Sequence, residues 1–150
     1  LAAAVRSTDL PREPLEALAE ARLRDLEGWP LGAEEATAYV DATAGRLMAL
    51  AVRALDPAAD PHAVRGAARA WGLAGLWRLG RLPADWTAAD VRTRVEEALA
   101  AARRELAGLP VAAFPAVAYA ALSRPYARGL APSELGKRAR LTLAVARGRI

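Results

Sequence analysis

Apolar residues recur at helical spacing along almost the whole chain of 150 residues, and no segment of any length alternates apolar and polar side chains as a half-buried strand does. This pattern predicts an all-α fold. Proline, glycine and short polar stretches separate the periodic segments, and there is neither an internal repeat nor a low-complexity linker. We therefore expect residues 1–150 to form one domain, a bundle of about six helices. The expected helices lie at about residues 11–28, 33–55, 62–79, 88–108, 111–128 and 133–150.

Composition limits the chemistry that the chain can perform. Cysteine is absent and His62 is the only histidine, which leaves almost nothing for disulfides, thiolate or histidine metal sites, or Ser-His-Asp triads. The net charge is +4 and the pI is near 10.3, but most arginines are interleaved with acidic residues as on solvated helix faces. Nucleic acid is therefore not an expected partner. The exception is residues 136–150, where every charged side chain is basic.

One uncharged run, residues 106–123, is long enough to test as a membrane span. It is rich in alanine, and Pro110 and Pro115 break its first half, so a buried core helix is the better interpretation. Residues 1–13 lack the basic region and apolar core of a signal peptide. We expect a cytoplasmic protein and leave open a peripheral contact with the inner membrane.

The acidic residues offer two candidate sites. Asp56 and Asp60 stand four residues apart, a spacing that on a helix would place two carboxylates on one face to hold Mg²⁺. Pro57 and Pro61 interrupt the helix on which this geometry depends, so we interpret the segment as a polar turn. Asp41 lies inside the second expected helix, among residues of both charges. It is either a site residue or a member of a surface network.

Glycines interrupt the interior of two expected helices: Gly45 in the second, and Gly72 and Gly75 in the third. Each costs a helix roughly 1 kcal/mol relative to alanine, so these surfaces must benefit from being narrow. One interpretation is close packing of the two helices, and the other is an apolar slot that both helices line. Close packing alone is the simpler of the two.

The order of the segments points to a known family. The stretch "DLPREPLEALAEARLRDLEG", which starts at Asp9, precedes a helix reading "AYVDATAGRLMALAVRAL". The segments "ARAWGLAGLWRLGRLP" and "FPAVAYAALSRPYARGL" and a closing basic helix then follow. In this order and spacing the chain resembles the squalene/phytoene synthase family over nearly its whole length. The resemblance implies part of the all-α isoprenoid synthase fold, namely its C-terminal two-thirds, with the family's N-terminal helices absent.

Members of that family join two allylic diphosphates head to head, with Mg²⁺ bridging the diphosphates to two aspartate-rich motifs on facing helices. The metal stabilises the leaving group, and a dry apolar cavity protects the carbocation. Against the family pattern Q-L-x-N-I-L-R-D-x-x-x-D, Arg78 keeps the arginine, whereas Gly72 and Gly75 replace the glutamine and the asparagine. Leu79 and Pro83 stand where the two aspartates belong. The other motif would precede the chain.

The resemblance therefore implies no catalytic and no metal-binding residue, and no cofactor except Mg²⁺ if the chain is an enzyme. It favours a catalytically degenerate member that binds a prenyl or lipid ligand or acts as an assembly factor, as a relative does for respiratory complex I. A truncated active prenyltransferase of isoprenoid biosynthesis and an unrelated helical interaction module are the alternatives.

A ligand cavity, if one exists, would take a prenyl diphosphate or a lipid, with Arg78 as the candidate for contacting a phosphate. The faces that the absent helices should cover predict a homo-oligomer or a protein partner. The six residues expected to line the cavity are Tyr39, Gly45, Met48, Gly72, Gly75 and Arg78.

Overall fold

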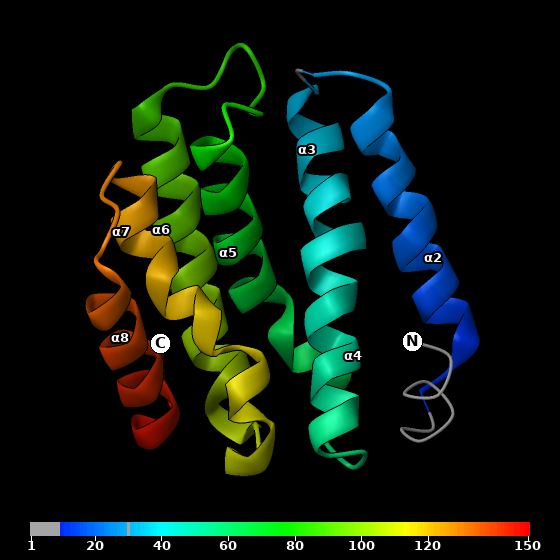
Figure 1. The fold of residues 1–150 in the computed structure, drawn as a ribbon, viewed down its shortest axis with the longest axis vertical. Coiled ribbons are helices and arrows are strands. Elements are labelled where there is room, and N and C mark those ends of the chain that lie inside the picture. Colours follow the sequence, from blue (N-terminus) through cyan, green and yellow to red (C-terminus); the bar gives the residue numbers. More distant parts are fainter. Residues whose placement is uncertain (1–9, 30) are drawn as a thin grey trace.

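The computed structural model describes residues 10–29 and 31–150, and all regular secondary structure in these ranges is helical (Figure 1). The predicted all-α fold is confirmed, with seven α-helices in the described ranges where about six were expected. The prediction that the chain lacks a signal peptide used residues 1–13. Of these, residues 1–9 lie outside the described ranges. The α-helices are α2 (Arg12–Leu23), α3 (Ala33–Val40), α4 (Arg46–Leu55), α5 (Arg65–Arg78), α6 (Ala88–Glu105), α7 (Ser123–Ala127) and α8 (Glu134–Arg147).

The second expected helix is a continuous rod over residues 33–55, as predicted, but its hydrogen bonding changes halfway. α3 passes into one π-helical turn, Asp41–Gly45, and this turn leads directly into α4 (Figure 1). π-helical turns are rare in proteins, and those that occur are often found at functional sites. Inside the turn the buried hydroxyl of Thr43 donates to the main-chain oxygen of Tyr39 at 2.7 Å. This bond ties the π-turn to the helix before it.

α5 lies at the centre of the bundle and packs against α6, α7, α3 and the π-turn (Figure 1). The core has two clusters of buried side chains. Val40 and Leu122 belong to the first cluster, and Val52 and Phe114 belong to the second. Trp71 of α5 packs against both clusters. Burial of these apolar side chains is the main force that holds the helices together.

Residues that favour helix ends mark the start of α6 and the turn after α2. At the start of α6, the N–H of Asp90 donates to Oγ1 of Thr87 at 3.2 Å, and the N–H of Thr87 donates to Oδ2 of Asp90 at 2.8 Å. α2 ends earlier than predicted, at Leu23, and a 3-10 turn over Arg24–Leu26 continues it. Gly28, with a φ of 98°, then turns the chain away as expected.

The segment expected as a proline-interrupted helix at 111–128 is largely not α-helical. Two 3-10 segments, Val111–Ala116 and Ala118–Leu122, precede the short α7. Pro115 lacks the N–H that an α-helix needs and would clash with the preceding turn, which favours the tighter geometry. Phe114 and Leu122 are nearly inaccessible, whereas Val111 and Tyr119 are more than half exposed, so the predicted burial of this run is confirmed only in part. No helix in the described residues is both long and apolar enough to cross a membrane.

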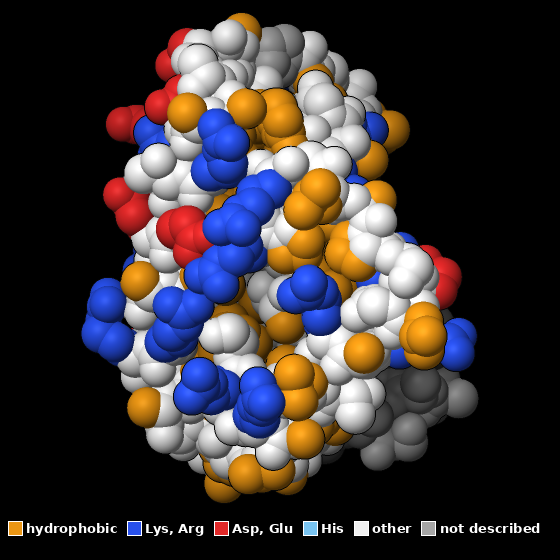
Figure 2. Space-filling view, turned by 90° about the vertical axis from the view of Figure 1, so that its left-hand side faces the viewer, with side chains coloured by type: hydrophobic (Ala, Val, Ile, Leu, Met, Phe, Trp, Pro, Cys, Tyr) orange, Lys and Arg blue, Asp and Glu red, His pale blue; other side chains and the backbone are white. Residues whose placement is uncertain are grey.

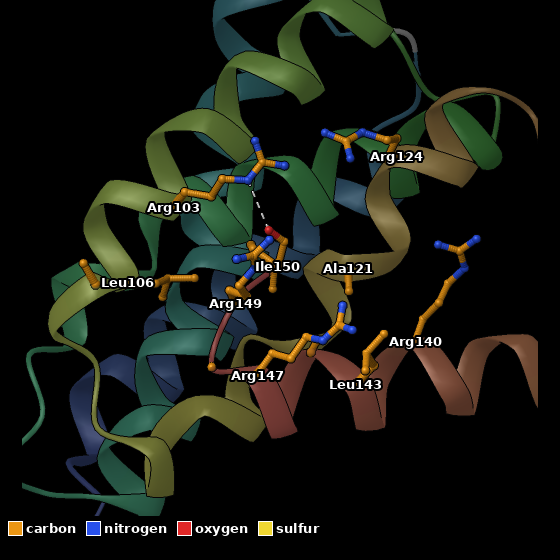
Figure 3. A pocket seen from close by; sticks show the side chains of 12 residues that line it. Arg103, Leu106, Ala121, Arg124, Arg140, Leu143, Arg147, Arg149 and Ile150 are labelled. Atoms are coloured by element: carbon orange, nitrogen blue, oxygen red, sulfur yellow. Dashed lines mark hydrogen bonds between the residues drawn. The ribbon is translucent and has the colours of Figure 1, made fainter.

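The basic stretch at 136–150 forms most of α8 and the residues that follow it. Ser133 caps α8 through a hydrogen bond from the N–H of Gly136 to its hydroxyl. α8 packs on the 3-10 segments and buries only Ala144. The face that α8 forms with α6 and α7 carries a concentration of basic side chains (Figure 2). Several of them surround a hollow (Figure 3).

Candidate functional site

The close approach of the second and third expected helices is centred on Gly72. A Cβ added to Gly72 would lie 2.5 Å from Cγ1 of Val40 on α3, so the glycine makes room for the valine. At Gly75 a Cβ would meet nothing within 4 Å, and at Gly45 it would meet only the main-chain oxygen of Val40, at 3.8 Å. Close packing therefore explains Gly72, and it does not explain Gly45 or Gly75.

A second close helix contact lies at Gly66, a residue that the sequence did not single out. A Cβ on Gly66 would lie 2.5 Å from the nitrogen of Ala102 and 2.8 Å from the oxygen of Ala98, both in the backbone of α6. The N–H of Gly66 also donates to Oε2 of Glu105 at 2.7 Å. No local pattern in the sequence sets Gly66 apart from the other small residues of this helix, because its role depends on the backbone of α6 that packs against it.

The two positions at which the resemblance expects aspartates, Leu79 and Pro83, do not share a helix face. α5 ends at Arg78, Leu79 follows as its cap with 66 % of its surface exposed, and Gly80 has a φ of 65°. Pro83 is fully buried beyond this turn. A helix would place positions four apart on one face, and here the chain leaves the helix between them. Neither the side chains nor the backbone at this point fits a pair of Mg²⁺-binding carboxylates.

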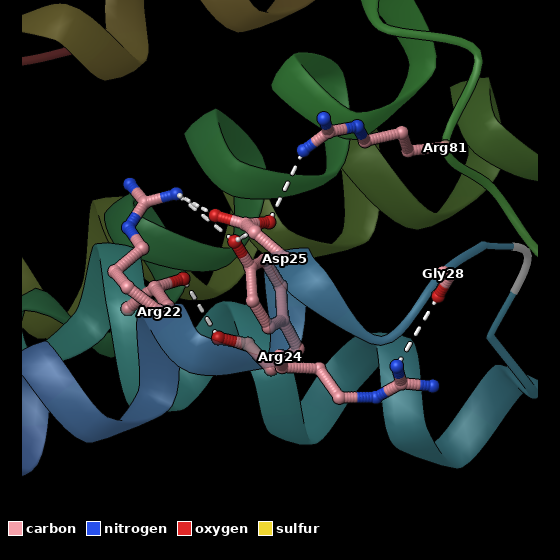
Figure 4. A network of polar contacts seen from close by, with 7 residues as sticks. Arg22, Arg24, Asp25, Gly28 and Arg81 are labelled. Atoms are coloured by element: carbon pink, nitrogen blue, oxygen red, sulfur yellow. Dashed lines mark hydrogen bonds and ion pairs between the residues drawn. The ribbon is translucent and has the colours of Figure 1, made fainter.

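A carboxylate at the same end of the bundle is already occupied by protein donors (Figure 4). Asp25 accepts hydrogen bonds from the hydroxyl of Tyr39 at 2.9 Å and from Nη1 of Arg81 at 3.1 Å. Nη1 of Arg22 lies 3.4 Å from the other oxygen of Asp25 and donates to the Tyr39 hydroxyl at 2.9 Å. Burial, followed by the bond to Asp25, raises the pKa of Tyr39. The network joins the first helix to the second and to the end of α5.

Asp41 belongs to an ion-pair network between helices. Its two oxygens accept hydrogen bonds from Nε and Nη2 of Arg69, at 2.8 and 2.7 Å, and Arg65 lies 3.5 Å away. Burial alone would raise the pKa of Asp41, but the hydrogen bonds and charge of Arg69, with a contribution from Arg65, lower it. Asp41 is therefore a member of a charged network, which is the second of the two interpretations. Its arginine partners lie on α5.

Asp41 and Gly45 also line a pocket of about 620 Å³ between the π-turn and the start of α5. His62, which is exposed, and Glu105 of α6 also line the pocket. The pocket combines both signs of charge with an apolar wall. Of the six residues expected to line a cavity, Gly45 is the one found in this pocket.

The structure does not bring the other five together around this pocket. The hydroxyl of Tyr39 is held by Asp25, and Met48 is buried in the second core cluster. The guanidinium of Arg78 lies 4.1 Å from the ring centre of Tyr126, a cation–π contact. A ligand contact by any of the six stays a prediction.

The remaining acidic candidates form a turn, as predicted. Oδ1 of Asp56 accepts from the N–H of Ala58 at 3.0 Å, and Oδ1 of Asp60 accepts from the N–H of His62 at 2.8 Å. Among the described residues no group of three or more His, Cys, Asp or Glu side chains is placed to hold a metal ion.

The described helices define an all-α protein, and this architecture is consistent with an isoprenoid synthase-like helical fold. Comparison with known families matches residues 1–82 to squalene/phytoene synthase. The match covers more than half of the chain, so this chain belongs to the squalene/phytoene synthase family. None of the curated proteins and none of the solved structures compared with the chain matches it. Family membership overturns the alternative of an unrelated helical module.

Proposed function

We propose that this chain is a catalytically degenerate member of the squalene/phytoene synthase family that works by binding and not by turnover. Its target is a prenyl or lipid ligand or a protein partner. Mg²⁺-dependent condensation is not its function.

One observation carries the proposal: Leu79 and Pro83 occupy the two aspartate positions of the family's second metal motif, and the helix that should present them ends at Arg78. Ionisation of an allylic diphosphate needs metal charge on the leaving group. A leucine and a proline offer no oxygen ligand, and Mg²⁺ accepts oxygen ligands almost exclusively.

Exposed apolar side chains support a binding role. Leu47 and Leu55 on α4 are 55 % and 47 % exposed, and Leu26, in the 3-10 turn after α2, is 83 % exposed. Exposed large apolar side chains are a feature of surfaces that contact partners.

A turnover assay tests the proposal. The chain is incubated with farnesyl or geranylgeranyl diphosphate, with and without Mg²⁺, and organic product and released diphosphate are measured beside an active family enzyme. We expect neither product nor released diphosphate above the protein-free background. Mg²⁺-dependent formation of a condensed product by this chain would overturn the proposal.

The variant Leu79→Asp/Pro83→Asp provides a second test in the same turnover assay. It restores the side chains of the motif without restoring the helix between them, so we expect it to remain inactive. Activity in this variant alone would show that the side chains, and not the backbone, limit the wild-type chain.

A further inference from the structure

A hollow of about 710 Å³ lies where α8 passes α6 and the 3-10 segment before α7 (Figure 2). Basic side chains enter it from several elements: one from α6, one from α7 and the others from α8 and the residue after Gly148 (Figure 3). They are Arg103, Arg124, Arg140, Arg147 and Arg149. The lining holds no acidic side chain.

Capping of α8 does not account for these arginines. Basic residues near a helix end often bind its last carbonyl groups. Here the N–H of Gly148 donates to the oxygen of Val145, and the N–H of Arg149 donates to the oxygen of Ala144, both at 3.2 Å. Gly148 has a φ of 58°, so main-chain groups close this helix end as a Schellman motif. The guanidinium groups are not needed for it.

The charges in the hollow are only partly balanced. Arg124 forms two hydrogen bonds with the carboxylate of Glu96, both at 2.6 Å, which fix its orientation and lower the pKa of Glu96. Nε of Arg103 donates to the main-chain oxygen of Ile150 at 3.2 Å. No Asp or Glu side chain in the described ranges forms an ion pair with Arg140 or Arg147.

The floor of the hollow is apolar. Leu106 and Ala144 are buried there, and Ala121 and Leu143 complete the wall between the arginines. An apolar floor lowers the local dielectric constant and strengthens the attraction between a guanidinium and an anion. A recess also suits a compact anionic group better than a flat surface does, because side chains can contact the group from several sides.

We propose that this hollow is a binding site for a phosphate-bearing anion, either a soluble diphosphate or the phosphate headgroup of a lipid. Guanidinium groups match phosphate oxygens with paired hydrogen bonds, and Arg124 is already oriented by Glu96. The site involves α6, α7 and α8 and not the end of α5. It is therefore independent of whether the chain is catalytically degenerate.

Calorimetric titration with inorganic pyrophosphate, without Mg²⁺, tests the site directly. The titration is done in about 0.15 M salt, where the Debye length is about 8 Å and distant charges are screened. The pocket variant is Arg140→Gln/Arg147→Gln. The control is Arg53→Gln/Arg92→Gln, which removes the same charge from exposed positions on α4 and α6 outside the lining. Circular dichroism verifies that both variants fold.

A second set of measurements identifies the source of the phosphate. Flotation with vesicles of phosphatidylcholine, alone or with phosphatidic acid, is performed on the same three proteins. We expect the pocket variant to bind pyrophosphate or phosphatidic acid vesicles about tenfold more weakly than wild type, and the control to bind within about twofold of it. Loss of pyrophosphate binding assigns the site to a soluble diphosphate, and loss of vesicle binding alone assigns it to a lipid headgroup.

Two results would overturn the proposal. One is an equal loss of binding in the pocket and control variants, which would show that binding depends only on the net charge of the protein. The other is the absence of binding by the wild-type chain to both pyrophosphate and vesicles.

Discussion

Single glycine-to-alanine changes along α5 separate the effect of close helix packing from that of helix propensity. In the interior of a helix, alanine is favoured over glycine by about 1 kcal/mol wherever its methyl group fits. Nothing lies within 4 Å of a Cβ at Gly75. We therefore expect Gly75→Ala to raise the free energy of unfolding by about 1 kcal/mol.

The same change at Gly66 has the opposite effect. Its methyl group would meet backbone atoms of Ala102 at 2.5 and 2.9 Å, and these atoms cannot move unless α5 and α6 separate. Overpacking of this severity costs about 3 kcal/mol. After the gain of about 1 kcal/mol in propensity, Gly66→Ala is expected to lower the free energy of unfolding by about 2 kcal/mol.

Gly72→Ala falls between the two, because its methyl group would meet the side chain of Val40 and not a backbone. Overpacking of about 2 kcal/mol less the propensity gain leaves a net loss of about 1 kcal/mol. In a Val40→Ala background the obstacle is removed, and Gly72→Ala should become stabilising. This double-mutant cycle isolates the contact between the two residues.

Thermal unfolding followed by circular dichroism measures the series. In a protein of this size each kcal/mol shifts Tm by roughly 2–4 °C. Gly75→Ala should melt above wild type, Gly72→Ala a few degrees below it and Gly66→Ala lowest. A Gly66→Ala protein as stable as Gly75→Ala would refute the packing of α5 against α6 described above.

Two further stability effects follow from buried and partly buried polar groups. Because the hydrogen bonds of Arg124 lower the pKa of Glu96 in the folded state, this ion pair stabilises the fold above the usual pKa of a glutamate and is lost as the pH falls through the folded value. Glu96→Gln should therefore cost less than about 1 kcal/mol at neutral pH, and the Tm difference from wild type should shrink as the pH falls below the usual pKa of a glutamate. A difference that does not change with pH would contradict the assignment. The hydroxyl of Ser123 is buried without a hydrogen-bond partner among the described residues, so Ser123→Ala should raise Tm by roughly 2–4 °C, about 1 kcal/mol, and a lower Tm in calorimetry would show that the hydroxyl is bonded.

The sequence predicted those features that depend on local physics. Helical periodicity located the rod at 33–55 and the start of α6 at residue 88. Proline spacing predicted the turn at Asp56 and Asp60. The sequence did not predict that residues 111–122 form 3-10 segments and not an α-helix. The choice between the two geometries around Pro115 depends on how this run packs against the rest of the protein.

The candidate site was less predictable, because it depends on which side chains meet across helices. Close packing was the simpler of two interpretations for Gly45, Gly72 and Gly75, and of these three it holds at Gly72. Gly66 was not predicted, since only the packing on α6 shows its role. The ion pair between Asp41 and Arg69 joins residues 28 positions apart, and no local pattern indicates such a pairing. The sequence shows the basic stretch at 136–150, but no local pattern joins it to the arginines of α6 and α7 that line the same hollow.

Native mass spectrometry with farnesyl diphosphate, recorded with and without Mg²⁺, tests the central claim most directly. A chain that works by binding, with Leu79 and Pro83 in place of the motif aspartates, should give the same mass distribution in both conditions, with either intact ligand bound or none. A ligand complex that forms only when Mg²⁺ is present would reveal a functional metal site and contradict the account.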